Sequence, residues 1–156
     1  MEDKMDKQRE DNLLFTQGWT SELLLHMQTH PKVDSPKLMH HCSQYHYNLN
    51  QMDNILQPFV GDLEGFIEFL TKEWGWIVKY NAKEKTLIAD ENKNFCVCPI
   101  VNNMDDKKIS PLLCHCSEGF AKLMFRKVIG SEVSAEVISS ILRGDKSCIY
   151  QIKFNQ

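Results

Sequence analysis

The stretch Trp74–Asp90, WGWIVKYNAKEKTLIAD, marks the point where the chain changes from helical to extended periodicity. Within it, Trp76–Tyr80 and Thr86–Ala89 are two short apolar runs separated by the polar turn Asn81–Lys85. Two such runs joined by a short polar connection predict a β-hairpin. Gly75, just before them, suits the C-terminal end of a helix. We therefore expect helices before this stretch and a mainly antiparallel sheet after it.

Helical spacing of apolar residues recurs three times before this point. The first helix is expected over about Leu13–His26, after a flexible, charged lead-in at residues 1–12. The second begins with Ser35 as N-cap and Pro36 in its first turn, and the third begins with Asp62 as N-cap. The apolar faces expected to be buried are Phe15, Trp19, Leu23 and Met27 in the first helix, Leu38, Cys42, Tyr45, Leu49, Met52 and Leu56 in the second, and Leu63, Phe66, Ile67, Leu70 and Trp74 in the third.

Beyond the hairpin, the pattern predicts further strands with one helix between them. Phe95–Cys98 is expected to be a third short strand, and residues 100–113 a loop. A helix is expected over about Glu118–Ile129, with Ser117 as its N-cap. Two strands then close the chain, and the turn Arg143–Lys146 joins them.

These elements predict an α+β fold, with N-terminal helices followed by a mostly antiparallel sheet with one inserted helix. The 156 residues suit a single domain over 1–156, with a helical part at 13–75 and a sheet part at 76–156. The formal net charge of −3 does not favour nucleic acid as a partner. No run approaches the roughly 20 apolar residues of a membrane helix, so no membrane partner is expected. The charged N-terminus is unlike a secretory signal, and we expect a cytoplasmic protein with reduced thiols.

Five of the six cysteines lie in the expected sheet part. Cys96 and Cys98 would share one face of a strand, because side chains alternate along it. Cys114 and Cys116 flank His115 just before a helix N-terminus, where a thiolate is favoured. Two close thiol pairs suit a tetrahedral soft-metal site, with zinc as the first candidate cofactor. Cys96, Cys98, Cys114 and Cys116 are therefore the predicted metal ligands; the alternative is that they are small buried hydrophobic residues.

Three further residues are candidates for ligand binding: Cys42, His46 and His115. Cys42 and His46 are one turn apart on the second expected helix, so they could chelate a metal or pair as thiolate and imidazolium. The alternative is that Cys42 packs in the core while His40 and His41 are solvated. Cys148 shares an apolar face with other residues of the last strand and is expected to pack in the core.

The C-terminal half also resembles known families. It contains Cys-x-Cys-Pro at 96–99, Cys-x-Cys-Ser-x-Gly at 114–119, an amphipathic helix ending at Gly130, and Gly-Asp-x-x-Cys at 144–148. This order resembles a group of uncharacterised bacterial and archaeal cysteine-rich proteins. More distantly, it is similar to the vinyl-reductase-type small-ligand domain and to the L-2-amino-thiazoline-4-carboxylic acid hydrolase family. In the vinyl-reductase-type domain a cysteine stands four residues before the Gly-Asp turn, where this chain has Ser140.

The resemblance implies an α+β domain that encloses a small ligand beside a cysteine-lined site. We expect a cytosolic domain that binds a small molecule or a metal ion there. The alternative is a hydrolase that opens a C–N or C–S bond of a small heterocycle, with a cysteine or a metal-activated water as the nucleophile. A third possibility is a structural or regulatory domain in which the cysteines only pack.

Overall fold

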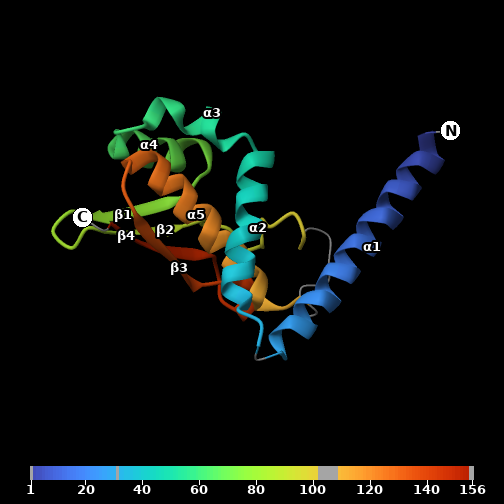
Figure 1. Ribbon diagram of the computed structural model, residues 1–156. Coiled ribbons are helices and arrows are strands. Elements are labelled where there is room, and N and C mark those ends of the chain that lie inside the picture. Colours follow the sequence, from blue (N-terminus) through green and yellow to red (C-terminus); the bar gives the residue numbers. More distant parts are fainter. Residues whose placement is uncertain (1, 31, 102–108, 155–156) are drawn as a thin grey trace.

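The computed structural model describes residues 2–30, 32–101 and 109–154, and side chains from residue 5 on. Residues 102–108 of the loop predicted at 100–113 lie outside the described residues. In chain order the elements are α1 (Glu2–Gln28), α2 (Ser35–Leu49), α3 (Met52–Leu56), η1 (Gln57–Phe59), α4 (Leu63–Glu73), β1 (Ile77–Asn81), β2 (Thr86–Asp90), η3 (Pro111–Leu113), α5 (Cys114–Ile129), β3 (Val133–Ser139), η4 (Ile141–Arg143) and β4 (Ile149–Phe154) (Figure 1). The predicted α+β class is confirmed.

The sheet has the order β1-β2-β4-β3, and each neighbouring pair is antiparallel. Along β2 and β4, the alternating residues Leu87, Ala89, Tyr150 and Ile152 are buried on one face. This face packs against the buried residues of α4 and α5 in the main core, which includes Phe66, Leu70, Met124, Phe125 and Val128. Helix α5 lies between the sheet and α2, so the molecule has three layers at this point (Figure 1).

The strand predicted at Phe95–Cys98 is wrong. The Glu91 amide still donates to the Cys148 carbonyl at 3.0 Å, but Asn92 then adopts a left-handed φ of 55° and turns the chain out of the sheet. Residues 95–98 follow as irregular structure. Cys96 and Cys98 pack instead on a second apolar cluster, made of Leu24, Met39, Val101, Ile109 and Leu113.

The inserted helix begins earlier than predicted. Helix α5 starts at Cys114, so Ser117 is not its N-cap. The preceding turn η3 has Ser110 as its cap, and the Ser110 hydroxyl accepts from the Leu112 amide at 3.2 Å. The segment Cys114–Cys116 therefore forms the first turn of α5 rather than an approach to it.

Two other N-caps were predicted. Helix α2 is capped by Asp34 instead of Ser35, with the Asp34 carboxylate accepting from the Lys37 amide at 3.2 Å. The cap of α4 is confirmed, because Asp62 accepts from the Gly65 amide at 2.9 Å.

The apolar face predicted for the second helix is wrong over α2. Leu38, Cys42, Tyr45 and Leu49 are exposed, and the buried positions are Ser35, Met39, Ser43 and Tyr47. The reason is the close crossing of α2 and α5. A Cβ atom at Gly119 of α5 would lie 2.3 Å from the Ser43 hydroxyl oxygen and 3.1 Å from the His40 Cα. Small residues, not the apolar stripe, therefore decide which face of α2 is buried.

The second helix is also shorter than predicted. It ends at Leu49, and Gln51, with a left-handed φ of 51°, separates α2 from the short helix α3.

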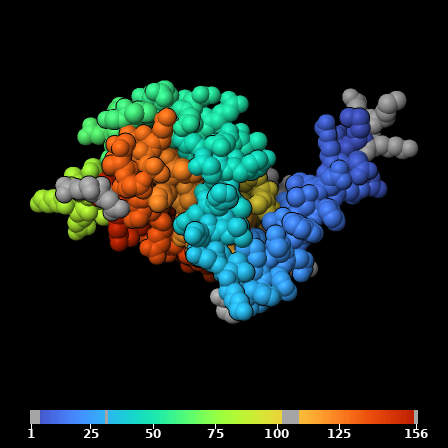
Figure 2. Space-filling model, in the orientation of Figure 1, coloured from blue at the N-terminus to red at the C-terminus, as the bar shows by residue number. Residues whose placement is uncertain are grey.

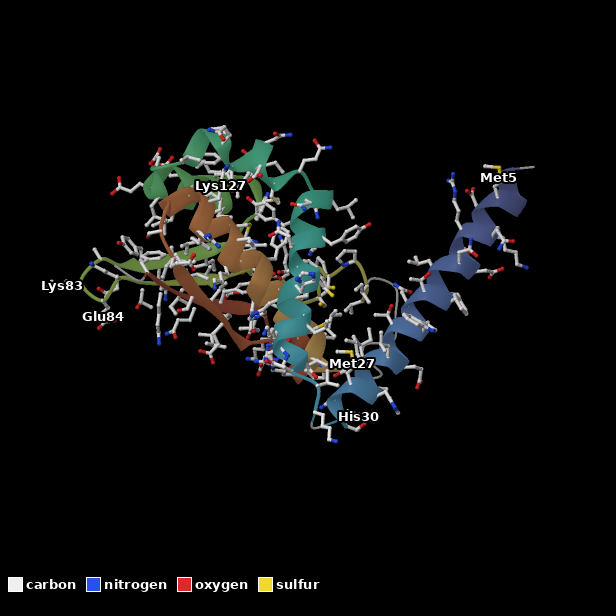
Figure 3. All side chains as sticks on the ribbon, in the orientation of Figure 1. Met5, Met27, His30, Lys83, Glu84 and Lys127 are labelled. Atoms are coloured by element: carbon white, nitrogen blue, oxygen red, sulfur yellow. The ribbon has the colours of Figure 1, made fainter. Side chains whose placement is uncertain are left out.

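Helix α1 extends away from the rest of the molecule (Figures 1 and 2), and Met5 and His30 mark its two ends in Figure 3. Its C-terminal part is anchored by buried Leu24 and by Gln28, whose side-chain oxygen accepts from Ser110 at 2.7 Å. The predicted buried face is wrong, since Phe15 and Trp19 are 73% and 61% exposed. The helix begins at Glu2, well before the predicted start, and the flexibility expected for residues 1–12 stays a prediction.

Among the described residues, no helix combines the length and apolar character needed to cross a membrane.

A buried polar pair fastens the end of β2 to β4. The Tyr150 hydroxyl donates to a carboxylate oxygen of Glu91 at 2.6 Å, and both residues are buried. The second carboxylate oxygen of Glu91 has no hydrogen-bond partner among the described residues. Burial raises the pKa of Glu91, and the hydrogen bond from Tyr150 offsets only part of that shift.

Gly119→Ala tests the close crossing of α2 and α5. The added methyl group has no room beside Ser43 and His40, so we expect the free energy of unfolding to fall by about 1–3 kcal/mol. The matched control is Gly18→Ala on α1, where a Cβ would have no neighbour within 4 Å. That change should raise stability by about 0.5–1 kcal/mol through helix propensity. Urea unfolding followed by circular dichroism measures both; equal stability of the two variants would contradict this packing.

Glu91→Gln tests the buried carboxyl. Because the pKa of Glu91 is higher in the folded than in the unfolded chain, the folded state binds more protons between the two values. The contribution of Glu91 to stability is therefore complete below the ordinary pKa of about 4.3 and is lost as pH rises through the folded pKa. We expect the stability of Glu91→Gln relative to the wild type to increase with pH over that window. Exposed Glu84, replaced by Gln, is the control; a pH-independent difference for Glu91→Gln would contradict the assignment.

Candidate functional site

Three side chains from α2 and α5 meet beside the first turn of α5. His115 Nδ1 lies 2.5 Å from Glu118 Oε2, and His40 Nε2 lies 3.3 Å from the same oxygen. The three potential ligand atoms all lie within 4.8 Å of one another. Within residues 2–30, 32–101 and 109–154, this is the one group of three or more His, Cys, Asp or Glu side chains with that spacing. We call these residues the His–His–Glu cluster.

The fold places these side chains by two local rules. His115 and Glu118 are three residues apart on α5, so they lie on the same face of the helix. His40 comes from α2, where Gly119 allows the two helices to approach closely. The rings of His40 and His115 meet edge to face, with centroids 6.2 Å apart. The cluster therefore depends on the same crossing that selects the buried face of α2.

Glu118 is the buried centre of the cluster. Its side chain is 8% exposed, against 26% for His115 and 42% for His40. Its second oxygen, Oε1, accepts from the Val137 amide of β3 at 3.1 Å. Burial alone would raise the pKa of Glu118, but the hydrogen bonds from His115, Val137 and His40 together hold it below its ordinary value. The cluster thus presents an ionised carboxylate that opens to solvent on the side of His40.

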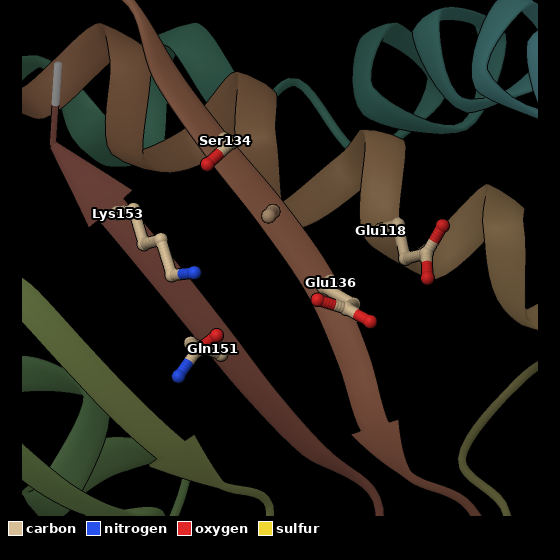
Figure 4. Close-up of a pocket in the computed structure, with 6 residues that line it drawn as sticks. Glu118, Ser134, Glu136, Gln151 and Lys153 are labelled. Carbon is tan, nitrogen blue, oxygen red and sulfur yellow. The ribbon is translucent and has the colours of Figure 1, made fainter.

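Glu118 also lines a cavity of about 290 Å³ between α5 and the sheet (Figure 4). The other lining residues come from β3 and β4; they are Ser134, Ala135, Glu136, Gln151 and Lys153. A second cavity of about 380 Å³ lies towards the other end of α5, lined by Gln44, Tyr47, Asp53, Leu123, Arg126, Lys127 and Gly130. Charged and polar residues make up most of both linings.

The structure brings several thiols together near the start of β4. The Cys96 thiol donates a hydrogen bond to the Cys148 sulfur. Ser140, which is fully buried, contacts two sulfurs: its hydroxyl oxygen lies 3.1 Å from the Cys114 sulfur, and its side chain is hydrogen-bonded to Cys148. We call Cys96, Cys114, Cys148 and Ser140 the thiol cluster. The prediction that Cys148 packs in the core is confirmed.

The remaining predicted metal ligands, Cys98 and Cys116, are half-buried. Electrostatic repulsion from Cys98 acts on both Cys114 and Cys116, which indicates that these sulfurs are neighbours. Burial raises the pKa of Cys98 and Cys114, and raises that of Cys116 to about 11. These thiols are therefore protonated at neutral pH. Their role as a zinc site stays a prediction.

Of the three predicted ligand-binding residues, His115 joins the His–His–Glu cluster, and Cys42 and His46 do not. Cys42 is exposed on α2. The His46 ring stacks on Phe120 with centroids 4.5 Å apart, and burial lowers the pKa of His46. Ligand binding by Cys42 and His46 stays a prediction.

The sequence analysis passed over His40 and Glu118. His40 was interpreted as a solvated histidine and Glu118 as the first residue of a helix. The i, i+3 spacing of His115 and Glu118 is a signal that could have linked those two, had the helix start been placed correctly. Nothing in the sequence links either residue to His40, which is 78 positions from Glu118.

The comparison with solved structures supports the fold. The chain is similar to a trafficking protein particle complex subunit 3 from Naegleria fowleri, solved covalently bound to palmitic acid. The TM-score is 0.54 and the identity 10%, with 95% of this chain and 97% of that chain covered. At this identity the similarity shows the fold alone.

No curated protein matches the chain. The resemblance to the vinyl-reductase-type domain and to the thiazoline hydrolase family therefore stays a prediction, whereas the expectation of an uncharacterised family is confirmed. Residues 2–156 match the Family of unknown function (DUF6144), and the chain belongs to that family.

Proposed function

We propose that this domain binds a divalent transition-metal ion as its small ligand, through His40, His115 and Glu118. The observation that carries the proposal is the convergence of three potential ligand atoms within 4.8 Å. Two imidazoles and one carboxylate form the donor set of many catalytic zinc sites and of non-haem iron sites. The predicted zinc cofactor is thus retained, with a different set of ligands.

The apo geometry is close to what an ion needs. In a tetrahedral site with metal–ligand bonds of about 2.0–2.1 Å, two ligand atoms lie about 3.3 Å apart. The distance from His40 Nε2 to Glu118 Oε2 already has this value, and His115 Nδ1 has to move outward from 2.5 Å. The ion replaces the protons that the two rings now direct at the carboxylate, so binding releases protons.

The surroundings favour a preorganised site. The Val137 amide holds Glu118 Oε1, which orients Oε2 toward the two rings, as groups behind a metal ligand commonly do. The lowered pKa of Glu118 keeps an anionic ligand available at neutral pH. The exposed edge of His40 gives an ion access from solvent.

The fold neighbour holds a covalently bound fatty acid, which supports the idea that this fold can enclose a small ligand. The two cavities described above are lined mainly by polar and charged residues, and these linings favour a polar ligand over an acyl chain.

The second candidate is the hydrolase with a metal-activated water. Three protein ligands leave the fourth position of a tetrahedral zinc ion open, and a water bound there can act as a nucleophile. This observation favours the metal-dependent form of the hydrolase over the form with a cysteine nucleophile, because burial keeps Cys98, Cys114 and Cys116 protonated. Location in the cytoplasm remains part of the proposal.

Calorimetric titration of the chelator-treated full chain with Zn²⁺ tests the proposal. We expect one ion per chain in the wild type and at least a tenfold loss of affinity in His115→Ala and Glu118→Gln, because each removes one of three ligands. His41→Ala is the matched control, since His41 is exposed on α2 and outside the cluster. Circular dichroism checks that Glu118→Gln, which keeps an acceptor for the Val137 amide, still folds.

Titration with Co²⁺ separates the two possible ligand sets. A His–His–Glu site gives visible ligand-field bands without the intense near-ultraviolet absorption of a thiolate–cobalt bond. Strong thiolate absorption that survives in Glu118→Gln and disappears in Cys96→Ser/Cys98→Ser would move the site to the cysteines. Absence of binding in the wild type would overturn the proposal altogether.

A further inference from the structure

The thiol cluster is separate from the proposed metal site, and it contains one sulfur in an unusual position. Cys148 lies just before β4, with 8% of its surface exposed. Three groups donate hydrogen bonds to its sulfur: the Cys96 thiol, the Ser140 side chain and the Ile141 amide. Ile141 opens the turn η4, so its amide is free to point outward.

Three donors on one sulfur favour its thiolate form, because hydrogen bonds to the charged form lower a pKa. The hydrogen bond from Cys96 has the largest effect and lowers the pKa of Cys148, against the opposing effects of burial and of the Glu91 charge. The same bond raises the pKa of Cys96. Between the two thiols the proton therefore belongs to Cys96, and Cys148 is the nucleophile.

Cys96 is in direct contact with this nucleophile, whereas Cys114 is in contact with the Ser140 hydroxyl. Cys96 is also half-exposed and lies on the irregular segment after β2, which is not held in the sheet. Such a segment can adjust to the geometry that a disulfide requires more easily than two strand residues can. This placement suits a reactive cysteine with a second cysteine that resolves its oxidised form.

We propose that Cys148 and Cys96 are a redox-active pair that forms a disulfide on exposure to a two-electron oxidant of the peroxide class. The proposal does not depend on the metal site. It adds a covalent modification to a chain whose thiols are otherwise reduced.

The chemistry balances as follows for hydrogen peroxide. The Cys148 thiolate, having released its proton to solvent, attacks one peroxide oxygen; the O–O bond breaks and hydroxide leaves with the proton of Cys96 as water. The Cys96 sulfur then attacks the sulfenic sulfur of Cys148; the S–O bond breaks, the S–S bond forms, and the departing hydroxide takes a proton from solvent. Two thiols and one peroxide give one disulfide and two waters. A low-molecular-weight thiol reverses the reaction by thiol–disulfide exchange.

Mass spectrometry of the full chain tests the pair. The protein is treated with hydrogen peroxide in the presence of a chelator and then with N-ethylmaleimide. We expect the loss of two alkylatable thiols, a cross-linked peptide that contains Cys96 and Cys148, and recovery of both thiols after dithiothreitol. Cys42→Ser is the control, because Cys42 is exposed on α2 and outside the cluster. It should leave the cross-link unchanged.

The single variants identify the role of each sulfur. In Cys96→Ala we expect no cross-link and a dimedone-trapped sulfenic acid at Cys148, and in Cys148→Ala we expect neither. Since Cys148 is buried and its replacement could unfold the chain, Cys96→Ala, at a half-exposed position, is the decisive variant. A cross-link between another pair, or a dimedone adduct at Cys42 in place of Cys148, would overturn the proposal.

Discussion

The close crossing of α2 and α5 is the constraint on which the rest of the structure depends. It requires a residue without a side chain at Gly119, because any Cβ atom there would overlap the Ser43 hydroxyl. Packing to this density allows few substitutions without a compensating shift. The crossing decides which face of α2 is buried, and it brings His40 of one helix to Glu118 of the other. The core and the candidate metal site are therefore set by one helix contact.

Glu118 is the residue that joins this contact to the sheet. Its two oxygens reach Val137 in β3, His115 on its own helix and His40 on α2. A buried carboxylate with these partners is stable only while all of them are in place. The thiol cluster is held by a different set of contacts, around Ser140 at the start of β4. The two candidate sites are thus close to the same end of α5 and independent in their chemistry.

The parts of the fold that could be predicted from the sequence are those with strong local signals. The Asp62 cap, the hairpin of β1 and β2 and the alternation in β3 are of this kind, since each depends on neighbours in the chain. The buried face of α2 could not be predicted, because Ser43 is buried by its size and not by its hydrophobicity. The candidate site was half visible: His115 was selected for its cysteine neighbours, but its actual partners depend on tertiary packing.

The shape of the molecule follows from α1. Its 27 residues span about 40 Å at 1.5 Å per residue, whereas a compact chain of this length has a radius of gyration of about 15 Å. Because the helix is anchored mainly near Leu24 and Gln28, its other half projects beyond the globular part (Figure 2). The molecule therefore tumbles as an elongated body, with slower rotation about the axes perpendicular to α1 than about the axis parallel to it.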